Sequence, residues 1–521
     1  MSHGLFAELY KAGITFTLID TRERRDYVAG HWFGSINIPL SLFSTRLCYL
    51  FRSTNIPIDV LDWGDEASAE ALHQLKTIGF WNVTTHKTSH PGRMGSGFVK
   101  GEFVWSKAFG EVVAHEMDLP EVTPQQYLAT HRDALLFDVR PTAEYRDFTI
   151  PASQSLPNSL LLANTQALKD TGKMSLLHCA GRTRSIIGAF TLMASGYDGP
   201  FAVFRGGTQA WQLDGYEREH GANRVFAKNT EIKDQETSNA VARFLRRWQI
   251  PREHVPAEQL AAYTFAHSEE LLFDVSDDAA TGKLAANGII KISGTNLVQQ
   301  TDRSIARYHV PITLFDHGSG SRAAFAAFWL NSMGYTVKLV YIDAPIATID
   351  KSNAKSSTCF GITLPPIPHI TAAQLSDWQD GSIYDFRSSE AFQKGHITNS
   401  HWQNISVVLH QPSDQFLPPP LLAMVADSMA AASLIANCLT RRGWQIAGIY
   451  IWNDKDFSLS KLSSGGLDSP VDNSDLYAGR HHGSLRDAQN YLAWEENLPD
   501  EVDRSIHDLW CQRLSRTPCL D

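Results

Sequence analysis

Apolar and polar positions along the chain repeat one arrangement four times. A short apolar run closes on an aspartate in each case, at Asp20, Asp138, Asp274 and Asp385. A second apolar run ends at a turn 41 or 42 residues later, at Asp62, Cys179, Asp316 and Ala426. A helical pattern then stops 17 or 18 residues further on, at Gly79, Gly196, Gly334 and Gly443, each followed by an aromatic residue. Because glycine just beyond a helix is a common C-cap, each repeat predicts a buried strand, a turn and a helix.

Strands that alternate with helices predict the α/β class, with a mostly parallel sheet covered by helices on both faces. We expect four tandem repeats at residues 1–111, 112–235, 236–360 and 361–475, and a C-terminal helical tail at 476–521. Apolar positions around Tyr491–Trp494 and Ile506–Leu514 predict that this tail packs across domains. Linkers are expected near residues 112–121, 222–250 and 345–368.

The turn of the second repeat carries the clearest chemistry. Residues 178–185 are His-Cys-Ala-Gly-Arg-Thr-Arg-Ser, between an apolar run that ends at Leu177 and a helical pattern that starts at Ile186. A cysteine there lies beside backbone N–H groups that lack an intrahelical partner, at the positive end of the helix dipole. Arg182 and Arg184 add two positive charges, and such surroundings lower the pKa of a thiol. The turn therefore predicts a nucleophilic Cys179 thiolate in a loop that binds anions.

The length of this loop narrows the chemistry. Four residues separate Cys179 from Arg184, whereas a phosphatase that forms a cysteinyl phosphate has five and would need arginine in place of Ser185. The shorter loop makes a tighter cradle, which suits sulfur bound to the thiolate better than a tetrahedral phosphate. The alternative interpretation is an inert, buried cysteine beside two surface arginines.

Segments on both sides of the loop resemble those of rhodaneses, the thiosulfate sulfurtransferases, and so favour the reactive cysteine. The similar segments are Asp138-Val139-Arg140, Glu144-Tyr145, Ile150-Pro151-Ala152, Leu156-Pro157 and Gly206-Gly207 with Trp211. One departure is Phe148-Thr149-Ile150, where rhodaneses have Gly-His-Ile.

The resemblance implies both a fold and a site. Each repeat would be a rhodanese-like domain with a five-stranded sheet, and over roughly residues 1–475 the chain resembles bacterial proteins with four tandem rhodanese domains. Cys179 would be the catalytic residue, with Asp138 and Arg140 bracing the loop as an ion pair. No metal or organic cofactor is implied. The substrate-binding residues would be Ala180, Gly181, Arg182, Thr183, Arg184 and Ser185.

The other three turns lack the groups that this chemistry needs. The first carries Asp62, Asp65 and Glu66, the third starts with Asp316 and is one residue longer, and the fourth starts with Ala426. A carboxylate cannot form a persulfide, and its charge would repel thiosulfate. We expect these three repeats to be catalytically silent.

Composition limits the partners and the location. A net charge of −10 at pH 7 and a pI of about 6.0 argue against nucleic acid or an acidic membrane surface as a partner. No apolar stretch approaches the roughly 18 residues of a membrane span, and no signal-peptide pattern begins the chain, so we expect a cytoplasmic protein. The cysteines have no zinc-like spacing, which predicts reduced thiols, although a disulfide between the last two stays open. They are Cys48, Cys179, Cys359, Cys438, Cys511 and Cys519.

The favoured hypothesis is a thiosulfate sulfurtransferase that works by double displacement. Cys179 would attack the outer sulfur of a small anionic donor, sulfite would leave, and cyanide or a thiol would remove the sulfur from the persulfide. Arg182 and Arg184 would hold the sulfonate, which suits thiosulfate better than mercaptopyruvate. The acceptor thiol would belong to a small molecule or a protein. The second hypothesis is a persulfide carrier or scaffold in sulfur trafficking, in which the three silent repeats bind protein partners.

Overall fold

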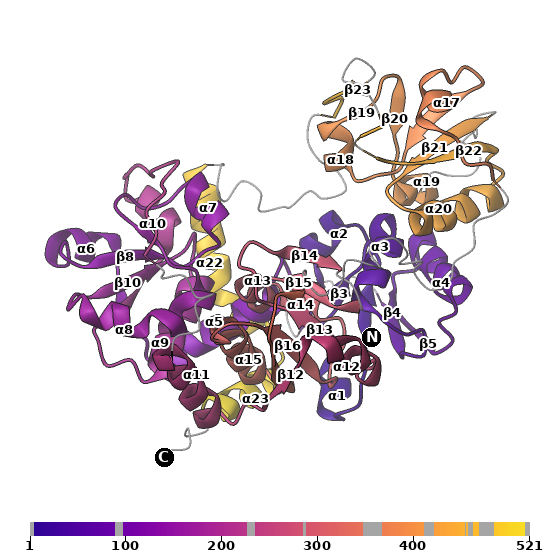
Figure 1. The fold of residues 1–521 in the computed structure, drawn as a ribbon. Helices are drawn as coiled ribbons and strands as arrows, with labels where there is room; N and C mark the ends of the chain where they lie inside the picture. Colours follow the sequence, from indigo (N-terminus) through magenta and orange to yellow (C-terminus); the bar gives the residue numbers. More distant parts are fainter. Residues whose placement is uncertain are drawn as a thin grey trace. The chain divides into compact units, whose positions relative to one another are not determined.

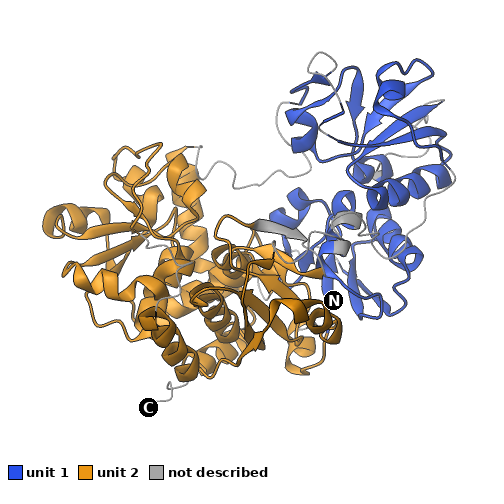
Figure 2. Ribbon diagram, in the orientation of Figure 1, with its two compact units in different colours: residues 1–2, 16–93, 356–476 blue, residues 3–15, 94–355, 477–521 orange. Residues whose placement is uncertain are grey.

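The computed structural model describes residues 5–88, 97–226, 235–284, 288–346, 367–410, 421–453, 455–456, 462–467 and 484–515. The chain forms two compact units, coloured separately in Figure 2. Unit 1 combines residues 1–2, 16–93 and 356–476, and unit 2 combines residues 3–15, 94–355 and 477–521. The first and fourth repeats therefore share unit 1, whereas the second and third share unit 2 with the C-terminal tail.

Unit 1 contains two four-stranded sheets with their helices, and β19 and β23 pair in a separate two-stranded sheet (Figure 1). Its strands are β1 (Leu18–Asp20), β2 (His31–Trp32), β3 (Ile36–Asn37), β4 (Ile58–Asp62), β5 (Val83–Lys87), β18 (Ser382–Asp385), β19 (His396–Ile397), β20 (Ser400–Trp402), β21 (Leu422–Ala426), β22 (Ile446–Ile451) and β23 (Leu462–Ser463). Its helices are α2 (Arg24–Ala29), α3 (Phe43–Leu50), α4 (Glu66–Ile78), α17 (Ala372–Ser376), α18 (Ser389–Lys394), α19 (Ile405–His410) and α20 (Met429–Arg441). The sheet orders are β3-β1-β4-β5 and β20-β18-β21-β22.

Unit 2 contains a five-stranded and a six-stranded sheet. Its strands are β6 (Phe98–Val99), β7 (Glu121–Val122), β8 (Leu135–Asp138), β9 (Gln154–Ser155), β10 (Ser175–His178), β11 (Phe201–Phe204), β12 (Arg252–Val255), β13 (Leu271–Asp274), β14 (Thr281–Leu284), β15 (Ile290–Ile292), β16 (Ile312–Asp316) and β17 (Val337–Ile342). Its helices are α1 (Leu5–Lys11), α5 (Val104–Glu116), α6 (Pro124–Thr130), α7 (Thr142–Asp147), α8 (Leu161–Asp170), α9 (Thr183–Ser195), α10 (Gly207–Leu213), α11 (Gln235–Arg247), α12 (Leu260–Ala266), α13 (Gly294–Gln299), α14 (Thr301–Ser304), α15 (Ser321–Ser332), α22 (Leu485–Glu501) and α23 (Arg504–Leu514). The sheet orders are β7-β11-β10-β8-β9 and β12-β17-β16-β13-β15-β14.

The predicted α/β class with mostly parallel sheets is confirmed. Five strands were expected in each sheet, and within the described residues the number varies from four in both sheets of unit 1 to five and six in unit 2. The sixth strand, β14, pairs antiparallel with β15. The domain boundaries at residues 111, 235, 360 and 475 stay a prediction.

The predicted helix ends are confirmed in all four repeats. Gly79 and Gly196 are left-handed C-caps of α4 and α9, with φ of 103° and 78°. Gly334 and Gly443 lie one residue beyond the C-caps of α15 and α20, with φ of 109° and 82°. Glycine is required at such positions because a Cβ strains a left-handed backbone.

The sheet of the second repeat is buried on both faces, which explains why its strands are continuously apolar. Leu136, Leu176 and Phe204 face one core together with Trp211 of α10. Phe137 and Leu177, their neighbours in sequence, are also fully buried. Strands β8 and β10 run parallel with Asp138 opposite His178, so both strands end at the same edge of the sheet. The segments that follow these two strands therefore meet at that edge.

Two of the expected linkers contain helices instead. The stretch 112–121 begins inside α5, which is buried from Val104 to Val113 because α9, α14, α22 and α23 all pack against it. A helix that other helices contact on several sides is buried at polar as well as apolar positions, here including Lys107 and Glu111, so it lacks the one-sided apolar pattern by which helices are recognised. The stretch 222–250 contains α11, and the expected linker at 345–368 lies mostly outside the described residues.

The C-terminal tail is part of unit 2. Helix α22 packs against α5 and α10, and α23 packs against α5 and α15. Trp510 of α23 is fully buried, donates a hydrogen bond of 3.3 Å to the carbonyl of Met333, and meets the ring of Trp105 edge-on. Among the described helices, none combines the length and apolar content of a membrane span.

Candidate active site

Cys179 lies between the end of β10 and the start of α9, as predicted from the apolar pattern. It is a free cysteine that is 2% exposed. Its Sγ atom lies 3.8 Å from Oγ of Ser185, and that hydroxyl donates a hydrogen bond of 2.7 Å to the carbonyl of Arg182. The thiol is therefore enclosed by its own loop and by the elements that pack on the loop.

The N-terminus of α10 supports one side of the loop. The backbone N–H groups of Thr208 and Gln209 donate to the carbonyls of Cys179 and Ala180, both at 3.0 Å. Gly207 has a φ of +53°, and a Cβ on it would overlap the carbonyl of Cys179. Gly207 is thus required for the close approach of α10 to the loop.

The tail helix α22 supports the other side, through Glu495. Its Oε2 atom accepts a hydrogen bond of 3.2 Å from the backbone N–H of Arg182. Its Oε1 atom accepts one of 3.4 Å from the N–H of Thr183, and the Thr183 hydroxyl donates to the same oxygen. Glu495 is 1% exposed, so the N–H groups that were predicted to bind a substrate anion hold a buried carboxylate in this structure.

Sequence reasoning missed Glu495 because the residue lies 313 positions after Arg182, in a tail without a counterpart in the repeats. One signal was present. The buried face of α22 consists of Ala488, Tyr491, Glu495 and Leu498. A glutamate at a helical spacing that is otherwise apolar indicates a buried carboxylate that needs a partner.

The guanidinium of Arg182 points to carboxylates instead of an open site. It donates to Glu111 from Nε and Nη2, both at 2.9 Å, and to Glu121 from Nη2 at 3.1 Å. Its Nη1 atom forms an ion pair of 3.2 Å with Glu496. Burial raises the pKa of Glu111 to about 7 although Arg182 acts against it. The predicted role of Arg182 as a ligand of the donor sulfonate stays a prediction, and in this state its charge is balanced.

Arg184 is the cation that acts on the thiol. It is 6% exposed, donates a hydrogen bond of 2.7 Å to Glu144, and lowers the pKa of Cys179 by its charge. Its backbone carbonyl accepts a hydrogen bond of 2.9 Å from the side chain of Asn158. This bond fixes the start of α9 on the body of the repeat.

The expectation of a lowered thiol pKa is wrong for this state of the site. Burial raises the pKa of Cys179, Glu495 raises it further, and Arg184 and Ser185 act in the opposite direction without compensating. The loss of water around the sulfur outweighs the cation because a thiolate is poorly stabilised in an enclosed site.

Asp138 and Arg140 form a buried ion pair of 2.7 Å behind the loop. Burial opposes ionisation of Asp138, but the Arg140 guanidinium holds the pKa of that carboxyl at about 2. Thr149, which stands where rhodaneses have histidine, donates a hydrogen bond of 2.8 Å to Asp138. Phe148 supplies the carbonyl that accepts from Arg140. With the departure from the Gly-His-Ile pattern, the ion pair therefore still has a hydrogen-bond partner from each of these two residues.

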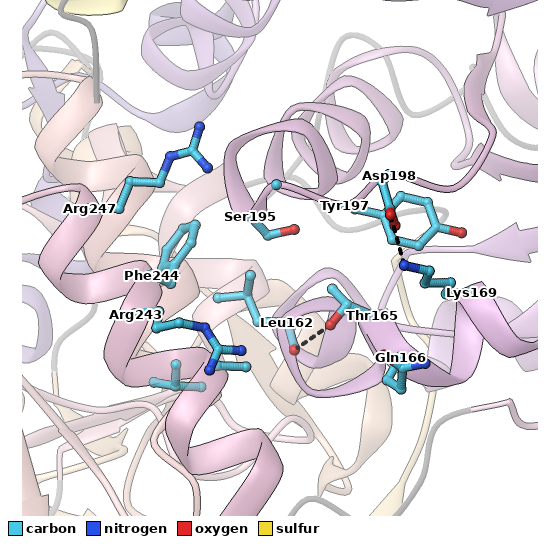
Figure 3. A pocket seen from close by; sticks show the side chains of 13 residues that line it. Leu162, Thr165, Gln166, Lys169, Ser195, Tyr197, Asp198, Arg243, Phe244 and Arg247 are labelled. Atoms are coloured by element: carbon cyan, nitrogen blue, oxygen red, sulfur yellow. Dashed lines mark hydrogen bonds and ion pairs between the residues drawn. The ribbon is translucent and has the colours of Figure 1, made fainter. Parts of the chain in front are cut away.

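A cavity of about 410 Å³ lies at the other end of α9 (Figure 3). Residues from α8 and α11 and the segment around Gly196 line it, among them Lys169, Arg243 and Arg247. Lys169 is already paired with Asp198 at 2.7 Å. Because Cys179 precedes the first turn of α9 and this cavity follows the last turn, the cavity is separate from the thiol. Among the described residues, no cluster of histidine, cysteine and acidic side chains could hold a metal ion.

Comparisons with known proteins match these observations. The family model of the rhodanese-like domain matches residues 123–214. A crystal structure of thiosulfate sulfurtransferase from Pseudomonas aeruginosa is similar over 97% of this chain and 98% of that one, with 24% identity and a TM-score of 0.79. The 3-mercaptopyruvate sulfurtransferase SseA from Escherichia coli aligns with 43% of this chain and 98% of its own, with 18% identity and a TM-score of 0.22. A search of curated proteins gave no match. The first of these structures shows that the fold extends over nearly the whole chain.

Proposed function

We propose that this chain, whose residues 123–214 match the family model of the rhodanese-like domain, is a sulfurtransferase that carries sulfane sulfur as a persulfide on Cys179. One observation carries the proposal. Next to a cysteine at the start of a helix, the loop N–H groups bind the Glu495 carboxylate with geometry suited to an anion. A nucleophile beside an anion cradle is the arrangement that transfer from an anionic sulfur donor needs.

The donor that fits best is thiosulfate. The Cys179 thiolate attacks the outer sulfur, a new S–S bond forms, and the original S–S bond breaks so that sulfite leaves with the electron pair. Cyanide or a thiolate then attacks the outer sulfur of the persulfide and restores the Cys179 thiolate. Arg184 lies close enough to act electrostatically on the thiol, which supports its role in stabilising the anions of both steps. The similarity to a thiosulfate sulfurtransferase over nearly the full length favours the same donor.

The first, third and fourth repeats do not catalyse. The residues at their turns are Asp62, Asp316 and Ala426, so none of the three has a thiol there. This excess of silent repeats also favours a second candidate function. In it the chain is a persulfide carrier that passes sulfur to a protein bound by one of the silent repeats.

Substitution of the thiol tests the proposal. Cys179→Ser is expected to abolish thiosulfate-dependent formation of thiocyanate from cyanide, because serine cannot hold a transferable sulfur. Cys438→Ser is the matched control, since Cys438 is also buried but lies in α20 of the fourth repeat. Equal loss in both variants, or turnover by Cys179→Ser, would show that Cys179 is not the carrier. A transfer to protein thiols that greatly exceeds transfer to cyanide would favour the carrier function.

A further inference from the structure

The N–H groups at the start of the equivalent helix are satisfied in a different way in the second repeat. In the first, third and fourth repeats the acceptor is a residue of the loop itself. Asp65 accepts from Ser68, Asp316 from Ala323, and Ser428 from Ala431. In the described part of the second loop, α9 has no side-chain cap of its own, and the acceptor is Glu495 from the tail. The loop that carries Cys179 is thus the one whose N–H groups bind a carboxylate from a distant helix.

The surface against which α22 packs fits the side chains of this helix closely. Gly101 has a φ of +94°, and a Cβ on it would overlap the ring of Trp494. The buried ammonium of Lys107 lies 4.7 Å from the centre of the Trp494 ring and 5.1 Å from that of Tyr491. A Cβ on Gly181 would approach Glu495 and Tyr491 within 3.1 Å, so these two side chains lie directly on the cysteine loop. The position of Glu495 is therefore fixed by specific packing within unit 2.

We propose that α22 is a gate over Cys179 and that Glu495 occupies the subsite where the donor anion binds. The inference rests on the sulfurtransferase function proposed above and adds how access to that site is controlled. With Glu495 in place, the thiol is 2% exposed and the N–H groups of Arg182 and Thr183 are taken. A dianion such as thiosulfate must displace the carboxylate, since both cannot share the same donors and their charges repel.

This exchange predicts which kinetic constant changes. When only an open fraction of the protein binds the donor, the apparent dissociation constant equals the intrinsic one divided by that fraction. Weakening the hold of Glu495 enlarges the open fraction and lowers KM for thiosulfate, while the chemistry on Cys179 and hence kcat stay the same. A merely structural Glu495 would change thermal stability and leave the KM untouched.

The direct test uses Glu495→Gln in the full chain, with Asp500→Asn as the matched control. Asp500 is exposed on the same helix, so the control removes the same charge without touching the loop. Because loss of a charge-assisted hydrogen bond changes an equilibrium by roughly 10- to 150-fold, Glu495→Gln is expected to lower KM for thiosulfate by about tenfold or more. Asp500→Asn is expected to keep the KM of the unaltered protein.

A second readout does not depend on sulfur transfer. Cys179 is alkylated with anionic iodoacetate and with neutral iodoacetamide, and the ratio of the two rates is measured on the Cys179 peptide. The gate predicts that Glu495→Gln raises this ratio, because the anionic reagent gains the vacated subsite. An unchanged KM and an unchanged ratio in a folded Glu495→Gln would overturn the gate, while the function stands if Cys179 still takes up sulfur. A raised ratio without sulfur uptake in any variant would keep the gate and overturn the proposed function.

The unaltered protein gives an independent test should Glu495→Gln fail to fold. Hydrogen–deuterium exchange of peptides from 485–501 is measured before and after addition of thiosulfate. The gate predicts faster exchange in α22 with thiosulfate and unchanged exchange in α20, which serves as the reference. Unchanged exchange in α22 while Cys179 carries sulfur would overturn the gate.

Discussion

The loops of the second and third repeats occupy the same place in neighbouring sheets of unit 2, yet they satisfy their N–H groups in opposite ways. In the third repeat, Asp316 is the last residue of β16 and stands at the turn where the second repeat has Cys179. Its carboxylate accepts a hydrogen bond of 2.8 Å from the N–H of His317 and one of 3.1 Å from that of Ala323. In the second repeat the loop residue is a thiol, and the carboxylate comes from Glu495 on α22.

The difference separates a loop whose helix start is capped by its own residue from a loop whose helix start is capped by another helix. A carboxylate built into the loop neutralises the helix start permanently, because the residue that carries it cannot leave. Burial raises the pKa of Asp316 to about 7 although Arg322 lowers it. Ionisation of this buried carboxyl in the third loop therefore costs free energy. A carboxylate supplied by another helix satisfies the same N–H groups but can be exchanged for a substrate. The repeat that we propose to be reactive is therefore the one whose helix start has no side-chain cap from its own loop.

The largest effect is expected from moving the thiol between the two loops. In a Cys179→Ser chain, Asp316→Cys is expected to restore no thiosulfate-derived sulfur, because the third loop is longer and its Arg322 is paired with Asp278 at 2.7 Å. Sulfur per chain, measured by mass spectrometry, should stay near zero, against about one equivalent for the unaltered protein. A full equivalent on the introduced thiol would mean that a cysteine at this turn suffices and that the surroundings of Cys179 are dispensable.

A smaller effect on sulfur transfer is expected from replacing the arginines of the two loops. Arg184→Ala should lower kcat/KM for thiosulfate, by roughly 10- to 150-fold if one charge-assisted hydrogen bond to the donor is lost. Arg322→Ala in the third loop is the matched control and should leave kcat/KM unchanged. Steady-state kinetics of both variants check this, and equal kinetic constants for the two would remove Arg184 from the site.

The smallest effect concerns pH. The pKa of Cys179 is raised by burial, so the reactive thiolate forms only as the pH rises above the usual range of a cysteine. The rate of alkylation by iodoacetamide should therefore still be rising where an exposed thiol has levelled off. Because Arg184 lowers this pKa and Glu495 raises it, Arg184→Ala should move the midpoint upward and Glu495→Gln should move it downward. Shifts in the reverse directions would contradict the electrostatics of the loop.

Much of the fold could be predicted from the sequence because its signals are local. A strand closing on aspartate, a turn, and a helix capped by glycine follow from a few adjacent residues, and Gly79 and Gly196 have the expected left-handed conformation. The ion pair of Asp138 and Arg140 is local too, since the partners are two positions apart in the sequence. Cys179 was found because its loop concentrates a thiol, arginines and a helix start within eight residues.

The features that escaped prediction depend on contacts between distant segments. Helix α5 was taken for part of a linker because it is enclosed by other helices. The prediction of a lowered pKa for the Cys179 thiol was wrong because burial beneath α22 and α10 cannot be inferred from the loop alone. Glu111, Glu121 and Glu496 surround Arg182 from three separate segments, so no spacing in the sequence reveals that its charge is balanced.

The most direct test of the account is the position of sulfur after one reaction with thiosulfate. The unaltered protein is treated with thiosulfate, freed of excess reagent, and analysed by intact mass and by peptide mapping under non-reducing conditions. The account predicts a gain of one sulfur atom per chain, located on the peptide that contains Cys179. No gain, or a sulfur located on Cys438 or Cys511, would contradict it.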